Sequence, residues 1–323
     1  PVVKAFYRFI DHPDEEAVSM PHILQPHRGR TVQRMKAQRT VLCIQDGSDL
    51  DYSSLAQCKG LGVIGTNQTS AQSRGLHLHT TLAVAANGLP LGVLRAQCVA
   101  SELKSPDDHR PSWAVRHRCV DLLVRANHNR GIIDEPFKLF EAVRQAPLQT
   151  KVQVHVPHQS ARPKLSKRKA RPKRPSRQAN MEVRCQRIQL RPPKYHSGKD
   201  PIDIWVIHAV ESSPPAGTEP VEWFLLTTVN IASSEDAVQC LRWYCLRWRI
   251  EDWHRVLKSG CAVERIAHDT AERIRRAIAI NVVIAWRIML MTLLGRQTPE
   301  LPPEVLFSDI ELQVLCAYSK KTA

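Results

Sequence analysis

Several features that mark common classes of protein are missing from this sequence. None of its nine cysteines forms a Cys-x-x-Cys pair, and most lie within apolar stretches. We therefore expect reduced, buried thiols in a reducing compartment, and neither a disulfide framework nor a zinc site. The longest charge-free apolar run, Ala277–Trp286, is too short to cross a bilayer. The opening PVVKAFYRF lacks the parts of a secretory signal, and its start at Pro1 instead of Met suggests that a segment precedes it.

Acidic residues are scarce relative to basic ones. The 323 residues include 46 Lys and Arg against 31 Asp and Glu, a net charge of +15, and 43% hydrophobic residues, enough for a folded core. The tract Ser160–Arg177 holds nine Lys and Arg and no acid, which leaves about +6 on the rest. Such an excess favours a polyanionic partner, nucleic acid or a membrane surface. Because the tract alternates with proline and lacks aromatics, it does not resemble a membrane-surface helix. It predicts either a solvated or a phosphate-binding loop.

The pattern of apolar residues predicts a mixed α/β chain. Residues 1–40 are mostly polar and predict helices, and Val41–Asp46 predicts a buried strand followed by a turn at Asp46–Ser48. Asn87-Gly88 predicts a hairpin between strands at Leu76–Ala86 and Leu89–Ala100. Further strands are predicted at Val120–Ala126, Lys151–His158, Met181–Leu190, Ile202–Val210 and Glu222–Ile231, and helices at Lys138–Ala146, from Ser233 to about Lys258, and at about Thr270–Leu294.

The predicted helix that ends near Lys258 carries the most informative pattern. At 100° per residue, one stripe about 80° wide contains Tyr244, Arg247, Glu251, Arg255 and Lys258. An apolar stripe on another side faces the predicted core. The charged stripe has two interpretations. It can be a solvated face with ordinary i,i+4 ion pairs, or a metal-binding carboxylate flanked by phosphate-binding cations.

The spacing Tyr244-x2-Arg247-x3-Glu251-x6-Lys258 resembles the Y-x2-R-x3-E-x6-K signature of the IS-four group of bacterial transposases. The chain is similar to the Tn-five-like members of that group over most of its length. The similarity includes VLCIQD followed by DYSS, EWFLLTT before the signature and KSGCAVER at its end. The basic SKRKARPKRP matches a loop of the family's β insertion. KAFYRFIDHPDEEA resembles the end of the family's N-terminal DNA-binding region.

The resemblance implies a ribonuclease H-like catalytic domain, interrupted by an antiparallel β insertion and followed by a helical C-terminal part. The implied divisions are a remnant of the N-terminal DNA-binding region at 1–40, the first part of the catalytic domain at 41–150, the insertion with its basic loop at 151–221, the end of the catalytic domain at 222–268, and the helical C-terminal region at 269–323.

The resemblance also implies the site residues. The family uses two Asp and one Glu to hold metal ions, and Asp46 and Glu251 match the first and third of these positions. Two Mg2+ ions, with Mn2+ as the alternative, then promote in-line displacement at phosphorus. The implied DNA-binding residues are Trp223, Tyr244, Arg247, Arg255 and Lys258, together with Lys167, Arg168, Lys169, Arg171, Lys173 and Arg174 of the loop. Trp223 matches an aromatic that receives a flipped base; the alternative is a core aromatic beside Phe224.

The sequence departs from the family at the second catalytic Asp. The family places it in an Asp-Arg-Glu-type motif on the fourth strand, but none of the fifteen Asp in this chain precedes an Arg. We expect that a segment carrying this strand is deleted between about Trp113 and Val120. Asp121 is the nearest carboxylate and a poor substitute, because it begins the following strand. The deletion leaves the first strand with an unpaired edge unless Ala114–Val124 takes its place.

These features predict a bacterial insertion-sequence transposase that cleaves and joins DNA by cut-and-paste transposition and is degenerate in this chain. Its partners are then transposon ends, target DNA and a second copy of the chain, without a membrane, in the cytoplasm and associated with the nucleoid. The alternative is a non-catalytic remnant that binds transposon ends or inhibits an intact transposase. A third, weaker interpretation is a general nucleic-acid-binding protein that relies on the basic tract alone.

Overall fold

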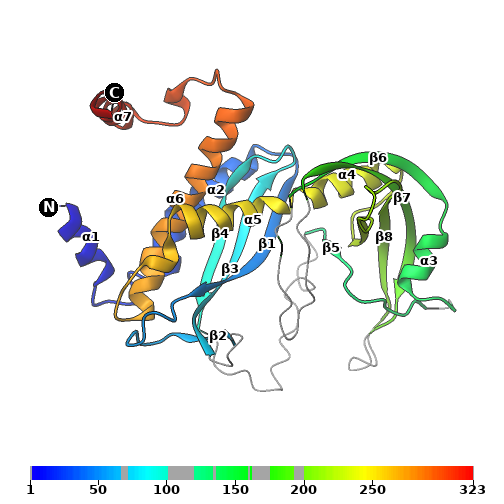
Figure 1. Cartoon of the computed structure of the whole chain (residues 1–323), viewed down its shortest axis with the longest axis horizontal. Coiled ribbons are helices and arrows are strands. Elements are labelled where there is room, and N and C mark those ends of the chain that lie inside the picture. Colours follow the sequence, from blue (N-terminus) through cyan, green and yellow to red (C-terminus); the bar gives the residue numbers. More distant parts are fainter. Residues whose placement is uncertain are drawn as a thin grey trace. The chain divides into compact units, whose positions relative to one another are not determined.

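The computed structural model describes residues 2–66, 72–100, 120–133, 136–158, 161, 175–192 and 200–322 (Figure 1). The chain divides into two compact units. Unit 1 contains Pro1–Asp107 and Trp248–Ala323, and unit 2 contains Asp108–Arg247. The division after Arg247 falls inside the predicted segment 222–268, so the residues of the signature are distributed over both units.

Unit 1 is built on a four-stranded antiparallel sheet. Its strands are β1 (Val41–Asp51), β2 (Gly62–Thr66), β3 (Gln72–Ala85) and β4 (Pro90–Val99). The strand β3 pairs with each of the other three. The predicted hairpin is confirmed: the Ala85 amide donates to the Leu89 carbonyl, and Gly88 has the positive φ of 92° that its turn requires.

The predicted end of the first strand is wrong. The strand β1 continues through the expected turn to Asp51, and Asp46 lies opposite Thr80 in the middle of its ladder with β3. Because β3 begins at Gln72, its residues Gly75–His79 pair with Gly47–Asp51 and extend the ladder. Gly47 serves close packing and not a turn, because a Cβ atom there would lie 2.8 Å from Nε2 of His77. Asp46 therefore lies in the middle of β1, with strand residues before and after it, and is paired with β3.

Helices complete unit 1 and supply most of its core. They are α1 (Val2–Ile10), α2 (Met20–Lys36), α5 (Trp248–Arg255), a π-helical turn (Val256–Gly260), a 3-10 turn (Val263–Arg265), α6 (Ala271–Gln297), a 3-10 turn (Pro303–Val305) and α7 (Asp309–Thr322). The predicted helices in 1–40 and near 270–294 are thus confirmed. The buried side chains of α5 and α6 join those of β1, β3 and β4 in one hydrophobic cluster.

Helix α6 is long and apolar enough to cross a membrane by length and composition, and it alone among the described helices meets that test. Its side chains at Ile274, Ile278, Val282 and Ala285 are buried in the core of unit 1. Arg276 is also buried, and both Arg275 and Arg287 hydrogen-bond to backbone carbonyls. This is the arrangement of a core helix in a folded domain.

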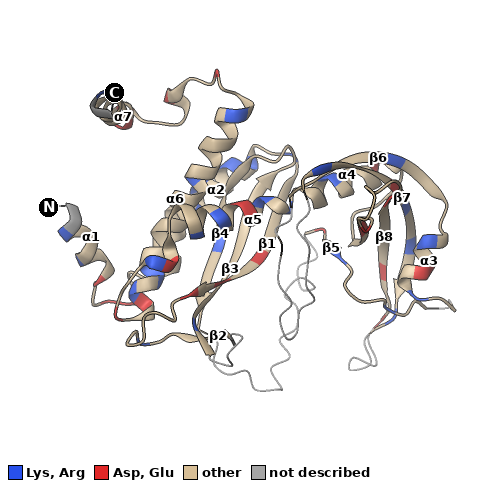
Figure 2. Cartoon of the chain, in the orientation of Figure 1, with Lys and Arg blue, Asp and Glu red and all other residues tan. Residues whose placement is uncertain are grey.

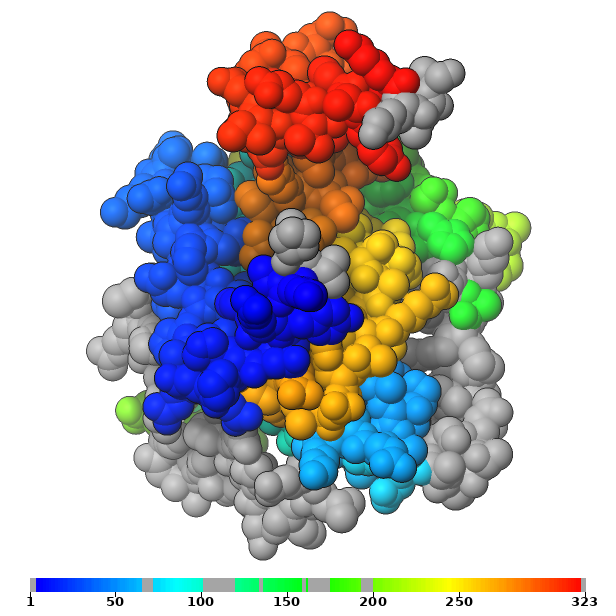
Figure 3. Space-filling view, turned by 90° about the vertical axis from the view of Figure 1, so that its left-hand side faces the viewer, coloured from blue at the N-terminus to red at the C-terminus, as the bar shows by residue number. Residues whose placement is uncertain are grey.

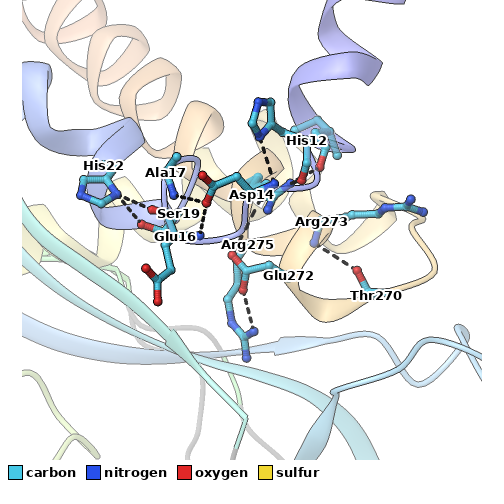
Figure 4. Close-up of polar contacts among 12 residues, drawn as sticks. His12, Asp14, Glu16, Ala17, Ser19, His22, Thr270, Glu272, Arg273 and Arg275 are labelled. Carbon is cyan, nitrogen blue, oxygen red and sulfur yellow. Dashed lines mark hydrogen bonds and ion pairs between the residues drawn. The ribbon is translucent and has the colours of Figure 1, made fainter.

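The beginning of α6 fastens the connector between α1 and α2 (Figure 4). Nη1 of the buried Arg276 donates to the carbonyls of Ile10, at 2.8 Å, and His12, at 2.7 Å. Arg273 lies 3.1 Å from the Asp11 carboxylate. Asp14 then accepts the amide of Ala17 and helps to close the turn before α2. A buried arginine of α6 thus donates hydrogen bonds to backbone carbonyls of the connector between α1 and α2, a segment distant in the sequence.

Helix α2 docks on β4 through polar contacts that set its rotation. The Val93 amide donates to Nε2 of His27 at 3.0 Å, and Nε of Arg34 donates to the Leu91 carbonyl at 2.5 Å. The Arg34 guanidinium also lies over the Trp286 ring of α6, 4.6 Å from its centroid. One face of α2 is therefore turned inward by its contacts with both β4 and α6.

Gly92 allows α2 to approach β4 closely. It has a φ of +150°, and a Cβ atom there would lie 2.0 Å from Oγ1 of Thr31. We expect Gly92→Ala to destabilise the protein by about 1–3 kcal/mol, because helix and strand must separate. The matched control is Gly29→Ala on the same helix, where nothing lies within 4 Å. It should stabilise by roughly 0.5–1 kcal/mol. Thermal unfolding of both variants tests this, and equal effects would contradict it.

The contact of His27 with β4 predicts a pH dependence of stability. Burial, with a smaller contribution from Arg34, lowers the pKa of His27 to about 4. Since the unfolded side chain titrates near 6.5, its stabilising contribution is complete above that pH and is lost as pH falls towards 4. We expect the melting temperature to fall over this window, and His27→Gln to reduce the slope. A slope unchanged in the variant would show that other groups cause it.

Unit 2 is a five-stranded antiparallel sheet with a helix on each side. The sheet has the order β5-β9-β8-β7-β6 and contains β5 (Leu123–Arg125), β6 (Leu148–Val156), β7 (Arg177–Leu190), β8 (Ile202–Glu211) and β9 (Glu222–Thr227). The helices are α3 (Leu139–Gln145) and α4 (Ser234–Cys245). One hydrophobic cluster joins α4 to the sheet face that bears Trp223, and another joins α3 to the face that bears Phe224. The predicted strands are confirmed, although β5 and β9 belong to the same sheet as the insertion.

The prediction of one helix from Ser233 to about Lys258 is wrong. Its start is confirmed, because Ser233 and Asp236 form a reciprocal capping box. However, α4 ends at Cys245 and α5 begins at Trp248. The Arg247 amide bonds to the Tyr244 carbonyl three residues back, which tightens and ends the first helix. The interruption lets α4 bury its apolar side in unit 2, while α5 buries its own in unit 1.

The mixed α/β class is confirmed, with antiparallel pairing for every named strand pair in the described residues. The expected deletion between Trp113 and Val120 lies almost wholly within 101–119, outside the described residues. Of residues 114–124, which were expected to replace the deleted strand, only 120–124 are described. Leu123 and Val124 begin β5, which pairs with β9 in unit 2.

Candidate metal and DNA-binding site

Asp46 lies on β1 and points to the side of the sheet that α5 covers. Side chains alternate along a strand, so Asp46 shares a side with the buried Ile44 and Leu50. Helix α5 packs against β1. Nδ1 of His254, on that helix, lies 3.9 Å from Oδ2 of Asp46. The carboxylate is partly exposed, and its other oxygen accepts the Gly47 amide at 2.9 Å.

His254 is a site residue that the sequence analysis missed. It is buried, and burial lowers its pKa to about 4, against the opposing effect of Asp46. The imidazole is therefore neutral at pH 7. Its Nε2 atom is buried and has no hydrogen-bond partner in the described part of the chain. The sequence held one signal for it: His254 follows Glu251 by three residues, the spacing of neighbours on one helix face.

Glu251 lies on α5, one turn before His254, and its side chain is partly buried. Asp46 and Glu251 thus lie in the same unit, on a strand and a helix that pack together. Asp121 belongs to unit 2, where its Oδ1 accepts a hydrogen bond from the Thr228 hydroxyl at 2.9 Å. This hydrogen bond gives Asp121 a structural role beside β5.

The described donor set is too small for a two-metal site. Over the described ranges, no group of three or more His, Cys, Asp or Glu side chains could hold a metal ion. Sites that bind Mg2+ for in-line displacement use several carboxylate oxygens. Asp46 and Glu251 supply two carboxylates, and His254 is a nitrogen donor that Mg2+ disfavours. The residues seen here therefore do not fit the pair of ions that the resemblance implies.

Lys258 is bound to the protein by two contacts. Its Nζ atom donates to the Asp49 carbonyl of β1 at 2.6 Å and lies 3.2 Å from Oε1 of Glu264. Glu264 in turn accepts the Asp51 amide at 2.9 Å. These contacts tie the π-helical turn to the end of β1. Arg255, by contrast, has a side chain that is 72% exposed and pairs with Asp252 at 3.2 Å on the same helix.

Lys258 and Arg255 therefore differ in their expected contributions to stability. We expect Lys258→Met to lower the free energy of unfolding by about 1–2 kcal/mol, because a partly buried charged hydrogen bond is lost. We expect Arg255→Met, the matched control, to change it by less than about 0.5 kcal/mol. Urea unfolding of the two variants measures the difference. Equal losses would mean that Lys258 does not fasten the turn to β1.

Tyr244 and Trp223 meet inside unit 2. Their ring centroids lie 5.3 Å apart in an edge-to-face arrangement, and the residues are 8% and 6% exposed. The Arg247 guanidinium lies 6.0 Å from the Tyr244 centroid. Both rings belong to the core between the sheet and α4. For either ring to stack on a base, this core would have to open.

The basic residues of the predicted loop, Lys167, Arg168, Lys169, Arg171, Lys173 and Arg174, lie outside the described residues. The strand that follows the loop is firmly held. Arg177 forms two hydrogen bonds with Glu211, at 3.0 and 2.7 Å, and the Glu211 side chain is almost fully buried. This bonding raises the pKa of Arg177. Arg177, which is one of the nine cations in the tract, thus stabilises the sheet.

No protein-family model matches the chain.

Proposed function

We propose that the chain is a transposase-type DNA-processing protein of ribonuclease H-like descent, with impaired cleavage and retained DNA binding. Proteins of this type carry out metal-dependent DNA cleavage and strand transfer at the ends of a bacterial insertion sequence. The observation that carries the proposal is the placement of Asp46 on β1 against α5, the helix that bears Glu251. These two residues are separated by 205 positions in the sequence. They match two of the three acidic positions of the family that the sequence resembles.

Asp46 and Glu251 are the remaining donors for Mg2+, or alternatively Mn2+. Lys258 fixes the turn after α5 to β1, and Arg255 offers an exposed cation on that helix. Arg247 and the basic loop add positive charge in unit 2. The proposed partners are transposon ends, target DNA and a second copy of the chain, in the bacterial cytoplasm near the nucleoid.

A second candidate function is a remnant that binds DNA without cutting it. One observation favours it: no third acidic ligand joins Asp46 and Glu251 within the described ranges. Such a protein would occupy transposon ends, or pair with an intact transposase and inhibit it. DNA binding by charge does not need a metal site, so it would survive loss of the second Asp.

Cleavage and binding assays on duplexes from the DNA flanking the gene separate these functions. We expect salt-sensitive binding without metal, and weak Mg2+-dependent cleavage that Glu251→Gln abolishes and Asp121→Asn leaves unchanged. Replacing an acidic donor with its amide removes charge and retains size. Binding with no cleavage in Mg2+ or Mn2+ would support the second candidate. A chain that neither binds nor cleaves the duplexes would falsify both.

A further inference from the structure

Glu264 lies against Lys258, one of the cations for which the resemblance implies DNA binding. The Oε1 atom of Glu264 accepts the Asp51 amide at 2.9 Å and lies 3.2 Å from Nζ of Lys258. A backbone amide and an ammonium group are two of the donors that proteins commonly use to bind a phosphate oxygen. The Glu264 carboxylate therefore occupies a position that suits a phosphate oxygen.

This ion pair lies at the surface of unit 1. The Lys258 side chain is 30% exposed and the Glu264 side chain is 32% exposed. Figure 3 shows the yellow and gold segment from α5 into the following turns beside light-blue residues that follow β1. Figure 2 shows acidic positions on β1 and α5 among the basic ones, so the surface here is not uniformly basic. Both members of the pair can be reached from solvent.

The backbone of the turn that carries Glu264 is held in place. Val263 is fully buried, and its carbonyl accepts the Tyr52 hydroxyl at 2.9 Å. Ala262 has a φ of 50°, in the left-handed region that residues other than glycine adopt only where the surrounding structure holds them. The exposed Glu264 side chain, by contrast, can change rotamer at its own bonds. Lys258 can thus be released without any movement of the turn.

Lys258 can exchange Glu264 for another anion while it stays attached to β1. An ammonium group has three donors, and one of them is bound to the Asp49 carbonyl at 2.6 Å. That bond remains when a phosphate oxygen replaces the carboxylate. However, the ion pair with Glu264 must be broken before Lys258 can contact phosphate, and this requirement weakens the binding of DNA.

We propose that Glu264 is an autoinhibitory residue, which competes with DNA phosphate for Lys258. DNA as the ligand, and Lys258 as its contact, rest on the proposed function. Glu264 lies outside the four positions of the Y-x2-R-x3-E-x6-K spacing and binds neither DNA nor metal itself. Its removal has the opposite effect to removal of Lys258, because it strengthens DNA binding instead of weakening it.

The test uses two variants of Glu264 in the full chain that separate charge from contact. Glu264→Gln removes the charge and keeps an oxygen for the Asp51 amide. Glu264→Asp keeps the charge and withdraws the carboxylate from Lys258 by one methylene group. Binding to the duplexes of the cleavage assay is measured at one low salt concentration without Mg2+, and circular dichroism checks folding.

Two further changes serve as controls. Asp203→Asn makes the same change in net charge and also breaks one exposed ion pair, that of Asp203 with Arg187 in unit 2. Lys258→Met removes the cation for which Glu264 competes, and Glu264→Gln is measured in this background as well. The comparison of the single and double variants isolates the coupling between the two residues.

We expect Glu264→Gln to bind the duplex about three- to fivefold more tightly than wild type, since an exposed ion pair no longer has to be broken. Glu264→Asp should show part of this gain. Asp203→Asn should change the Kd by less than about twofold, because solvent and salt screen an isolated surface charge. In the Lys258→Met background, Glu264→Gln should gain no more than this control.

The outcomes distinguish this proposal from the proposed function. If wild-type protein binds but Glu264→Gln and Asp203→Asn behave alike, Glu264 does not inhibit and the proposed function stands. An equal gain in the Lys258→Met background would assign the effect to charge alone and would also overturn the inhibition. If Glu264→Gln does not fold, Glu264→Asp decides, and binding no tighter than that of wild type contradicts the inhibition. If no form of the protein binds the duplexes, both proposals are wrong.

Discussion

The strand β3 organises unit 1, because it is the one strand to which all the others in its sheet are hydrogen-bonded. Its pairing with β1 places Asp46 opposite Thr80, and its pairing with β4 presents the edge on which α2 docks. Close approaches at Gly47 and Gly92 are parts of the same framework. Helices α2 and α6 contact β4, and helix α5 contacts β1. The candidate site depends on this packing.

The interruption between α4 and α5 has consequences for how the signature can work. Tyr244 and Arg247 belong to unit 2, whereas Glu251 and Lys258 belong to unit 1. A continuous helix would hold all four side chains in one fixed stripe. Here each half buries its apolar side in its own core, with Leu241 and Tyr244 in one and Ile250 and Trp253 in the other. Any common action of the four residues on DNA therefore requires the chain between the units to adopt a suitable conformation.

Charge is used in two different ways along this chain. Some cations are part of the fold: Arg276 bonds two carbonyls, Arg177 bonds a buried carboxylate, and Lys258 ties a turn to a strand. Others, as on α2, have no carboxylate beside them in the described part of the chain. The distinction matters because a cation that is already paired costs free energy to redirect, whereas an unpaired one gains by binding phosphate. The net charge of +15 is thus larger than the positive charge that is available to bind a partner.

Local pattern in the sequence determined the helices, most strands, the Asn87-Gly88 hairpin and the capping box at Ser233, because these depend on neighbours a few residues apart. The resemblance to a transposase family, and not local pattern, singled out Asp46 and Glu251 as candidates. Only the tertiary structure decided that β1 runs past Asp46, that His254 is buried beside it, and that Trp223 and Tyr244 pack together. It also divided the long helix after Cys245. These outcomes depend on contacts between residues distant in the sequence, and on which core each apolar side chain can reach.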